Sequence, residues 1–65
     1  MDYSKAVKEL RKKLLVSQSE LAEMLGVSFA TVNRWENKRY EPNYRAKRKL
    51  RELFKKNGIM LEEKE

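Results

Sequence analysis

Apolar residues recur at helical spacing in four stretches of the chain, and no stretch alternates strictly between polar and apolar residues. This pattern predicts an all-α fold. The helices are expected to span about residues 3–15, 18–25, 29–37 and 44–57. Their apolar stripes are Tyr3, Val7, Leu10 and Leu14 in the first, Leu21, Ala22 and Leu25 in the second, Val32 and Trp35 in the third, and Ala46, Leu50, Leu53 and Phe54 in the fourth.

The outer helices carry signals at their ends. Asp2 is placed to cap the start of the first helix, and Asn43 is placed to cap the start of the last. Gly58 followed by Ile59 is typical of a glycine C-cap with its hydrophobic contact. Residues 60–65 follow this stop signal, and we expect them to be a frayed tail.

Two short helices joined by a tight turn occupy residues 17–37, SQSELAEMLGVSFATVNRWEN. Ser17 and Glu20 have the spacing of a capping box, which begins the first of these helices. Gly26 suits the left-handed conformation that ends it. Ser28 then begins the next helix as its N-cap. So short a connection matches the helix-turn-helix motif, whose second helix enters the major groove of DNA.

The second helix of this motif has two different faces. At about 100° per residue, one side carries Ser28, Val32, Trp35 and Glu36, the opposite side carries Ala30, Asn33, Arg34 and Asn37, and Phe29 lies at the border. We expect the first side to face the core. The second side offers amide and guanidinium donors to a partner.

The central stretch resembles the phage repressor and Cro-like helix-turn-helix family, of the xenobiotic-response-element type. The resemblance rests on Gln18, Glu20-Leu21-Ala22, Gly26-Val27-Ser28, Val32 and Trp35-Glu36-Asn37. It implies a small lambda-repressor-like helical bundle that binds duplex DNA. Family members commonly have five helices, whereas one long fourth helix here takes the place of the last two, so four and five helices both remain open. Dimerisation elements often lie in that region, which leaves a homodimer on DNA open as well.

The expected base contacts lie on the outward side of the second motif helix. Arg34 is the best donor for guanine, and Asn33 can pair with adenine or a phosphate. Phe29 and Ala30 stand where family members often have glutamine, and they can touch only thymine methyl groups or sugar carbons. We therefore expect sparse hydrogen-bond readout of the bases.

The expected phosphate contacts surround that helix. Gln18 has its backbone N–H at the positively polarised start of a helix, and the resemblance implies that the family's matching glutamine binds phosphate there. A surface glutamine that only helps to cap the helix is the alternative. Lys38 and Arg39 follow the recognition helix and would lie close to a phosphate backbone. The full set is Ser17, Gln18, Thr31, Asn37, Lys38 and Arg39.

Two features of the family pattern bear on the backbone and the core. The family usually has glycine after the asparagine that matches Asn37, whereas this chain has Lys38. Either Lys38 adopts the left-handed conformation, at about 1 kcal/mol relative to glycine, or Asn37 does. Arg11 and Glu36 lie on the apolar sides of their helices, and each is costly to bury alone. The resemblance implies that they pair, so we predict a partly buried salt bridge between them.

Composition narrows the function classes. The net charge of +6 and a pI near 9.8 favour a polyanionic partner. The absence of histidine and cysteine removes the usual general base, disulfides and zinc-finger ligands, so we expect no enzyme, metal ion, cofactor or small-molecule substrate. No apolar run is long enough for a membrane span, and the charged start of the chain is unlike a secretory signal, which indicates the cytoplasm. At this length we predict one domain over residues 1–65.

The functional hypothesis is sequence-selective binding of duplex DNA by a transcriptional regulator, or by the DNA-binding part of one. A protein-interaction module such as an antitoxin or anti-restriction factor is the alternative, because it can use the same scaffold. The basic run within residues 45–57 also suggests a membrane-surface helix. We expect its apolar stripe to be needed for the core instead.

Overall fold

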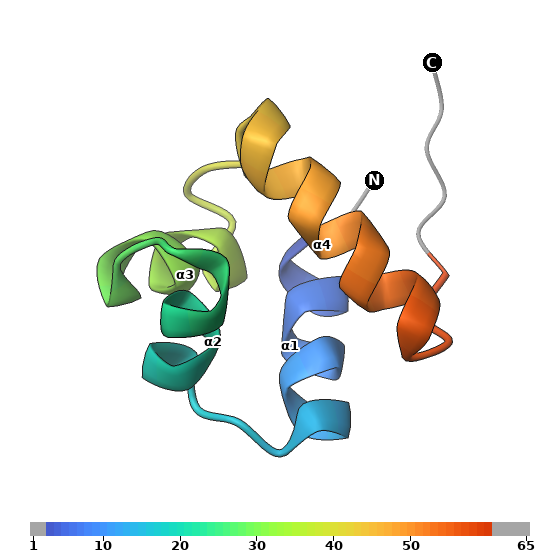
Figure 1. The fold of residues 1–65 in the computed structure, drawn as a ribbon. Helices are drawn as coiled ribbons and strands as arrows, with labels where there is room; N and C mark the ends of the chain where they lie inside the picture. Colours follow the sequence, from blue (N-terminus) through green and yellow to red (C-terminus); the bar gives the residue numbers. More distant parts are fainter. Residues whose placement is uncertain (1–2, 61–65) are drawn as a thin grey trace.

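The computed structural model describes residues 3–60, which contain four α-helices and no strand. The helices are α1 (Tyr3–Leu14), α2 (Gln18–Leu25), α3 (Phe29–Glu36) and α4 (Tyr44–Lys56) (Figure 1). The predicted all-α, four-helix architecture is confirmed, and the described residues hold no fifth helix. The cap expected at Asp2 and the tail beyond Met60 lie outside the described residues.

The first helix ends one residue earlier than expected. Leu15 has a φ of 58°, in the left-handed region, and so cannot continue the helix. The Val16 N–H donates to the Arg11 carbonyl oxygen over 3.1 Å, and the Leu15 N–H donates to that of Lys12 over 3.3 Å. This is the pattern that glycine usually makes at a helix end, with an exposed leucine in the glycine position.

The second helix has the predicted signals at both ends. The Glu20 N–H donates to Ser17 Oγ over 3.0 Å, and the Ser17 N–H donates to the Glu20 carboxylate over 2.8 Å. At the other end Gly26 has a φ of 72°, and the Val27 N–H donates to the Ala22 carbonyl oxygen over 2.9 Å. A residue with a side chain is strained in this conformation, whereas glycine is not. Gly26 therefore allows the tight turn between α2 and α3.

The third helix begins at Ser28, whose Oγ accepts from the Thr31 N–H over 3.1 Å. The side chain of Ser28 is exposed, which corrects its expected place on the inward side. A capping hydroxyl has to reach the open N–H groups at the helix end, which face solvent. Inward, α3 packs against α1 and α2, while α4 packs against α1 and α2.

The end of α3 decides between the two backbone alternatives. Lys38 has a φ of 61°, whereas Asn37 has a φ of −97° and lies outside the left-handed region. The Arg39 N–H donates to the Arg34 carbonyl oxygen over 2.9 Å and closes the helix one residue earlier than expected. The lysine therefore takes the position that family members usually give to glycine.

The last helix is capped by Asn43, whose Oδ1 accepts from the Ala46 N–H over 2.9 Å. After α4, Gly58 has a φ of 68° and Ile59 folds back so that its N–H meets the Phe54 carbonyl oxygen at 2.8 Å. Ile59 is buried, as its place after a glycine cap predicts. The helix itself ends at Lys56, one residue short of the expected bound.

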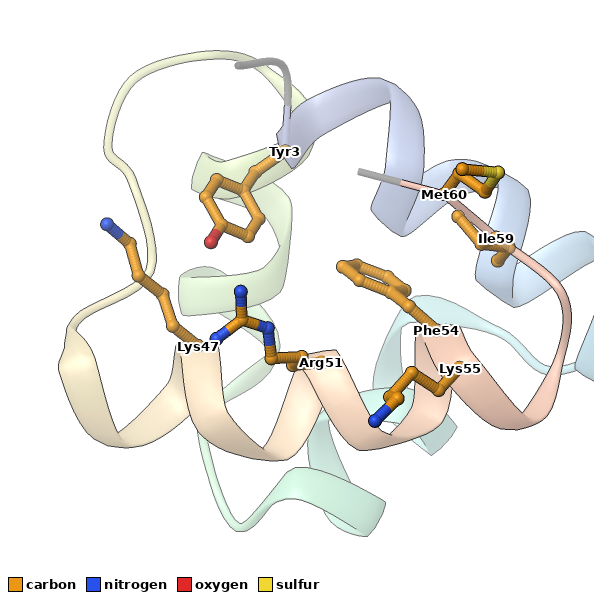
Figure 2. Close-up of a pocket in the computed structure, with 7 residues that line it drawn as sticks. All are labelled: Tyr3, Lys47, Arg51, Phe54, Lys55, Ile59 and Met60. Carbon is orange, nitrogen blue, oxygen red and sulfur yellow. The ribbon is translucent and has the colours of Figure 1, made fainter. Parts of the chain in front are cut away.

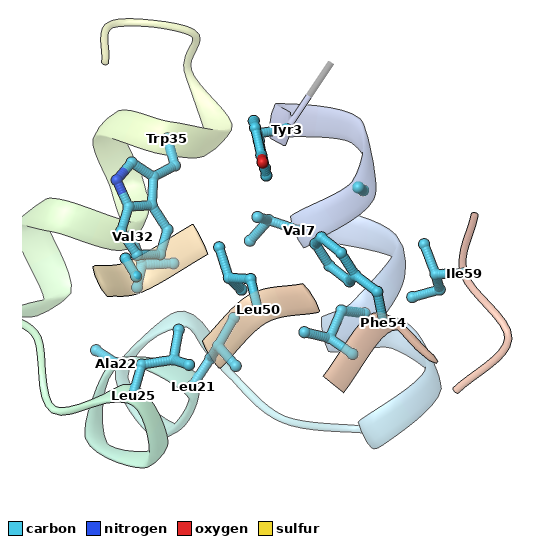
Figure 3. Close-up of a cluster of buried hydrophobic side chains, with 13 residues drawn as sticks. Tyr3, Val7, Leu21, Ala22, Leu25, Val32, Trp35, Leu50, Phe54 and Ile59 are labelled. Carbon is cyan, nitrogen blue, oxygen red and sulfur yellow. The ribbon is translucent and has the colours of Figure 1, made fainter. Parts of the chain in front are cut away.

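One core joins all four helices (Figure 3). Its buried members are Tyr3, Ala6, Val7, Leu10, Leu21, Ala22, Leu25, Val32, Trp35, Ala46, Leu50, Phe54 and Ile59. Val16 and Val27, the residues before the two motif caps, pack against it while partly exposed. The apolar stripe of α4 is thus buried in the core. No apolar face of this helix is left to insert into a membrane surface.

Candidate nucleic-acid interface

The recognition helix α3 is anchored by one face and exposed on the other. Val32, Trp35 and Glu36 are buried. On the outward side Ala30, Arg34 and Asn37 are exposed, Asn33 and Thr31 are partly exposed, and Phe29 is 52% exposed. The helix can therefore approach a partner without uncovering the core.

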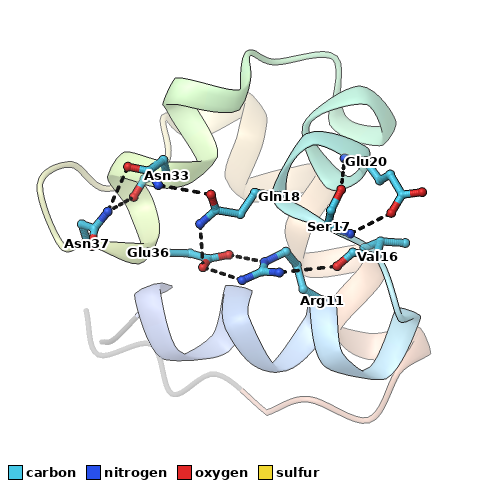
Figure 4. A network of polar contacts seen from close by, with 8 residues as sticks. All are labelled: Arg11, Val16, Ser17, Gln18, Glu20, Asn33, Glu36 and Asn37. Atoms are coloured by element: carbon cyan, nitrogen blue, oxygen red, sulfur yellow. Dashed lines mark hydrogen bonds and ion pairs between the residues drawn. The ribbon is translucent and has the colours of Figure 1, made fainter.

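A chain of polar contacts runs from α1 through α2 to the outward face of α3 (Figure 4). Arg11 donates to Glu36 through Nε at 2.6 Å from Oε2 and through Nη2 at 2.9 Å from Oε1. Gln18 Nε2 also donates to Glu36 Oε1, at 3.0 Å. Gln18 Oε1 accepts from Asn33 Nδ2 at 3.1 Å, and Asn33 Oδ1 accepts from Asn37 Nδ2 at 3.0 Å. The buried glutamate is thereby linked to amides on the exposed surface.

These hydrogen bonds alter the roles expected of the Gln18 and Asn33 side chains. Both are predicted to face DNA, but in the structure each uses one donor and one acceptor group in hydrogen bonds to neighbouring side chains. Each amide nitrogen carries a second hydrogen, and each oxygen a second lone pair. The backbone N–H of Gln18 belongs to the first turn of α2, where a helix has no carbonyl of its own to offer. A phosphate contact through that N–H remains compatible with the side-chain contacts.

The charge state of the pair follows from its surroundings. Burial alone would raise the pKa of the Glu36 carboxyl, but hydrogen bonds from Arg11 and Gln18 and the positive charges of Arg11 and Lys8 outweigh it. The pKa of Glu36 is therefore below its ordinary value. The hydrogen bond to Glu36 raises the pKa of Arg11. Both partners are charged at neutral pH.

Arg34, which follows Asn33, contacts a residue outside this hydrogen-bond network, Tyr40 in the loop after α3. Its guanidinium carbon is 5.6 Å from the ring centroid of Tyr40, within cation–π range. The two residues line a hollow of about 410 Å³ together with Ser28 and Thr31. The hydroxyls of Ser28 and Thr31 are 2.9 Å apart. Thr31 and Arg34 are thus brought together, as neighbours on one side of α3.

The remaining expected phosphate residues flank these two clusters. Ser17 precedes Gln18 and holds the capping box, while its side chain stays exposed. Asn37 Nδ2 donates to the Asn33 carbonyl oxygen at 2.9 Å as well as to the Asn33 side chain. Lys38 and Arg39 are exposed at the start of the loop between α3 and α4. The residues predicted to contact phosphate therefore continue without a break from the end of α3 into the following loop.

A groove elsewhere on the molecule contains none of the expected contact residues. It lies between the start of α1 and α4, has a volume of about 510 Å³, and is lined by Tyr3, Lys47, Arg51, Phe54, Lys55, Ile59 and Met60 (Figure 2). Lys47 Nζ is 5.4 Å from the Tyr3 ring centroid. These basic residues give the groove its charge, but they do not extend the surface of α3.

Three contacts in the structure are not predicted from the sequence. They are the amide contact between Gln18 and Asn33, the cation–π contact between Arg34 and Tyr40, and the hydrogen bond from Lys49 Nζ to the Leu25 carbonyl oxygen at 3.2 Å. The last satisfies a carbonyl at the end of α2 and places a positive charge at the negative end of its dipole. Each contact joins two different elements, so spacing within one helix does not predict it. Only the contact between Arg34 and Tyr40 could have been suggested by the sequence, because a left-handed residue at Lys38 turns the loop back toward α3.

Comparison with known protein families shows which family the chain belongs to. A family model for a helix-turn-helix matches residues 7–58, which is most of the chain. The chain belongs to this helix-turn-helix family, of the Cro and C1 type. No curated protein and no solved structure matches it. The matched residues run from Val7, within α1, to Gly58, so they include all of α2, α3 and α4 of this helix-turn-helix protein.

Family membership supports a DNA-binding helix-turn-helix of repressor type, and the family is not generally enzymatic. Within residues 3–60, every helix is too short or too polar to cross a bilayer.

Proposed function

We propose that this helix-turn-helix domain binds duplex DNA sequence-selectively through α3 and acts as a transcriptional regulator, or as the DNA-binding part of one. The observation that carries the proposal is the division of α3 into two faces. Trp35 and Glu36 anchor it inward, while Arg34 presents its guanidinium outward. Such a helix can enter the major groove with its orientation already fixed.

The base contacts would come from four side chains on the outward face. Arg34 would donate two parallel hydrogen bonds to guanine, since its planar donors match the O6 and N7 acceptors. Asn33 would use its remaining amide hydrogen and lone pair on adenine or a phosphate. Phe29 and Ala30 would pack against thymine methyl groups or sugars. With one strong hydrogen-bonding reader, the preferred site should tolerate changes at several positions.

The phosphate contacts would position the helix without reading sequence. We assign them to Ser17, Gln18, Thr31, Asn37, Lys38 and Arg39. The backbone N–H of Gln18 would act at the positive end of α2, with Lys38 and Arg39 supplying full charges. A protein of this kind would act in the cytoplasm, at the nucleoid of a prokaryotic cell, and binding as a homodimer would double the site.

Salt dependence tests DNA binding directly. Each lysine or arginine that neutralises a phosphate releases counterions, so affinity for a random duplex should fall on the order of tenfold or more between about 50 and 200 mM salt. Fluorescence anisotropy of a labelled duplex measures this. The double variant Lys38→Gln with Arg39→Gln should flatten the dependence, whereas the matched variant Lys55→Gln with Lys56→Gln, at the far end of α4, should leave it nearly unchanged.

The protein-interaction alternative makes a different prediction. A domain that only holds another protein has no reason to lose duplex affinity specifically when the charges beside α3 are removed. An affinity that stays flat with salt would reject the DNA proposal, and equal effects of the two double variants would reject the assignment of the interface to α3. If the domain binds duplex DNA, selection of duplexes from a random pool would identify its preferred site.

A further inference from the structure

Tyr40 lies in the loop after α3 and does not belong to the helix-turn-helix itself. Tyr40 is 66% exposed, so its ring is accessible at the surface. It follows Lys38 and Arg39, and the left-handed Lys38 turns the chain back toward α3. The bond from the Arg39 N–H to the Arg34 carbonyl oxygen, 2.9 Å long, fixes this return.

The return brings the tyrosine ring over the side chain of Arg34. The guanidinium carbon lies 5.6 Å from the ring centroid. Within residues 3–60 no hydrogen bond or ion pair holds the guanidinium group, so the ring is its positioning contact. A cation over a ring face is attracted by the electron-rich centre of the ring.

This arrangement differs from a salt bridge in what it leaves available. A carboxylate would occupy the N–H groups of the guanidinium, whose donors all lie in its plane. A ring contact through the guanidinium carbon, as at Arg34, occupies none of those N–H groups and leaves them available for a guanine edge. An arginine held in this way also loses less side-chain freedom when it binds.

We propose that Tyr40 is a positioning residue for sequence selectivity, which pre-orders the Arg34 guanidinium for a guanine in the major groove. The inference rests on the proposed function, because it assigns Arg34 to base readout. Tyr40 acts through Arg34 and needs no contact with DNA of its own.

The test compares Tyr40→Leu and Tyr40→Phe in the full chain at one fixed salt concentration. The probes are the duplex that the wild-type chain selects from a random pool and a scrambled duplex of the same composition. Tyr40→Leu should weaken binding to the selected duplex by about two- to fivefold, because the arginine side chain must then be ordered when it binds. Binding to the scrambled duplex should stay unchanged, and Tyr40→Phe, which keeps the ring, should retain the wild-type ratio.

A matched control is available at Tyr44. It is 77% exposed, and the guanidinium carbon of Arg48 lies 5.9 Å from its ring centroid, so it repeats the contact away from Arg34. Tyr44→Leu should leave the ratio between the two duplexes unchanged. Thermal melting should be the same for all three tyrosine variants, because each ring is mostly in solvent.

The deciding measurement is Tyr40→Leu in an Arg34→Ala background. If Tyr40 acts through Arg34, the second substitution should add no further loss of selectivity. A loss that persists without the arginine, or an unchanged ratio for Tyr40→Leu alone, would overturn the positioning role while leaving the DNA-binding proposal intact. A wild-type chain that shows no preference between the two duplexes would overturn both.

Discussion

Arg11 on α1 and Glu36 on α3 form a two-point ion pair, with Nε 2.6 Å from Oε2 and Nη2 2.9 Å from Oε1. The glutamate side chain is only 4% exposed, whereas the arginine side chain is 25% exposed. The two planar groups therefore set the rotation of α3 about its own axis relative to α1. Because Arg34 lies on the opposite side of α3 and Asn33 is joined to Glu36 through Gln18, the same contact sets the direction in which both side chains face.

Breaking this pair should be costly in an asymmetric way. Arg11→Met strands a buried carboxylate and should lower the free energy of unfolding by about 3 kcal/mol, the low end of the range for a stranded charge, because Gln18 still donates to it. Glu36→Gln leaves an arginine that can reach water and should cost less. Urea unfolding followed by circular dichroism measures both.

The double replacement checks the cause. Arg11→Met combined with Glu36→Leu removes both charges from the interface and should recover much of the stability lost in Arg11→Met. A double variant as unstable as the worse single variant would show that the helices depend on the pair for packing rather than for charge balance.

The lowered pKa of Glu36 predicts loss of stability in acid. Its folded pKa is below the ordinary value of 4.5, so the unfolded chain takes up the proton first as the pH falls. The stabilisation is therefore complete above the ordinary pKa and is lost as the pH falls through the folded value. The unfolding free energies of the wild type and Glu36→Gln should differ by a constant amount well above pH 4.5 and approach each other as the pH falls below that value. Parallel curves down to the lowest pH would contradict the lowered pKa.

How far the sequence predicts this structure depends on the range of each interaction. Ser17, Gly26 and Ser28 determine helix ends through contacts within five residues, and these are readable from spacing. The wheel of α3 places Trp35 inward for the same reason, since burial follows from period alone. Local signals therefore account for the four helices and for the two faces of the recognition helix.

The misses involve either a non-glycine residue or a partner from another element. Leu15 adopts a left-handed φ of 58°, which its sequence does not predict because leucine rarely takes this conformation. Gln18 reaches Asn33 across the helix pair, and Lys49 reaches the end of α2, so both depend on side-chain positions that exist only after packing. Spacing within one helix cannot supply these contacts. They decide how the outward amides are held, which is the part of the site that the sequence describes least well.

Removal of Trp35 should test the core. The side chain is 3% exposed and joins α3 to the other helices, so Trp35→Ala should cost about 3 to 5 kcal/mol. A domain of this size has little more than that to lose, and thermal circular dichroism should show it largely unfolded at room temperature. The matched surface variant Phe29→Ala should melt close to the wild type, because that ring is half exposed. An unchanged melting temperature for Trp35→Ala would mean that α3 does not pack by this face.

The left-handed backbone at Lys38 and Leu15 offers a gain in stability. Glycine meets no steric penalty at a φ near 60°, so Lys38→Gly should stabilise the domain by about 0.5 to 1 kcal/mol after its greater freedom in the unfolded chain is deducted. Leu15→Gly should behave alike, since its φ is 58°. Asn37→Gly should destabilise, because its φ of −97° suits any residue and its amide bonds to Asn33 would be lost. Chemical denaturation ranks the three, and a reversed order would show a different conformation after α3.

Arg34 and Lys38 should separate the two kinds of DNA contact. Arg34 presents in-plane donors on the outward face of α3, so Arg34→Ala should cost about 1 to 3 kcal/mol on the preferred duplex and much less on random duplex. Lys38 lies beyond the end of the helix and contributes charge, so Lys38→Gln should weaken both duplexes alike and reduce the salt slope by about 1. Anisotropy titrations at two salt concentrations measure both quantities. Equal losses on the two duplexes for Arg34→Ala, together with a reduced slope, would make Arg34 a phosphate contact and move base readout to Asn33 and the apolar residues at the start of α3.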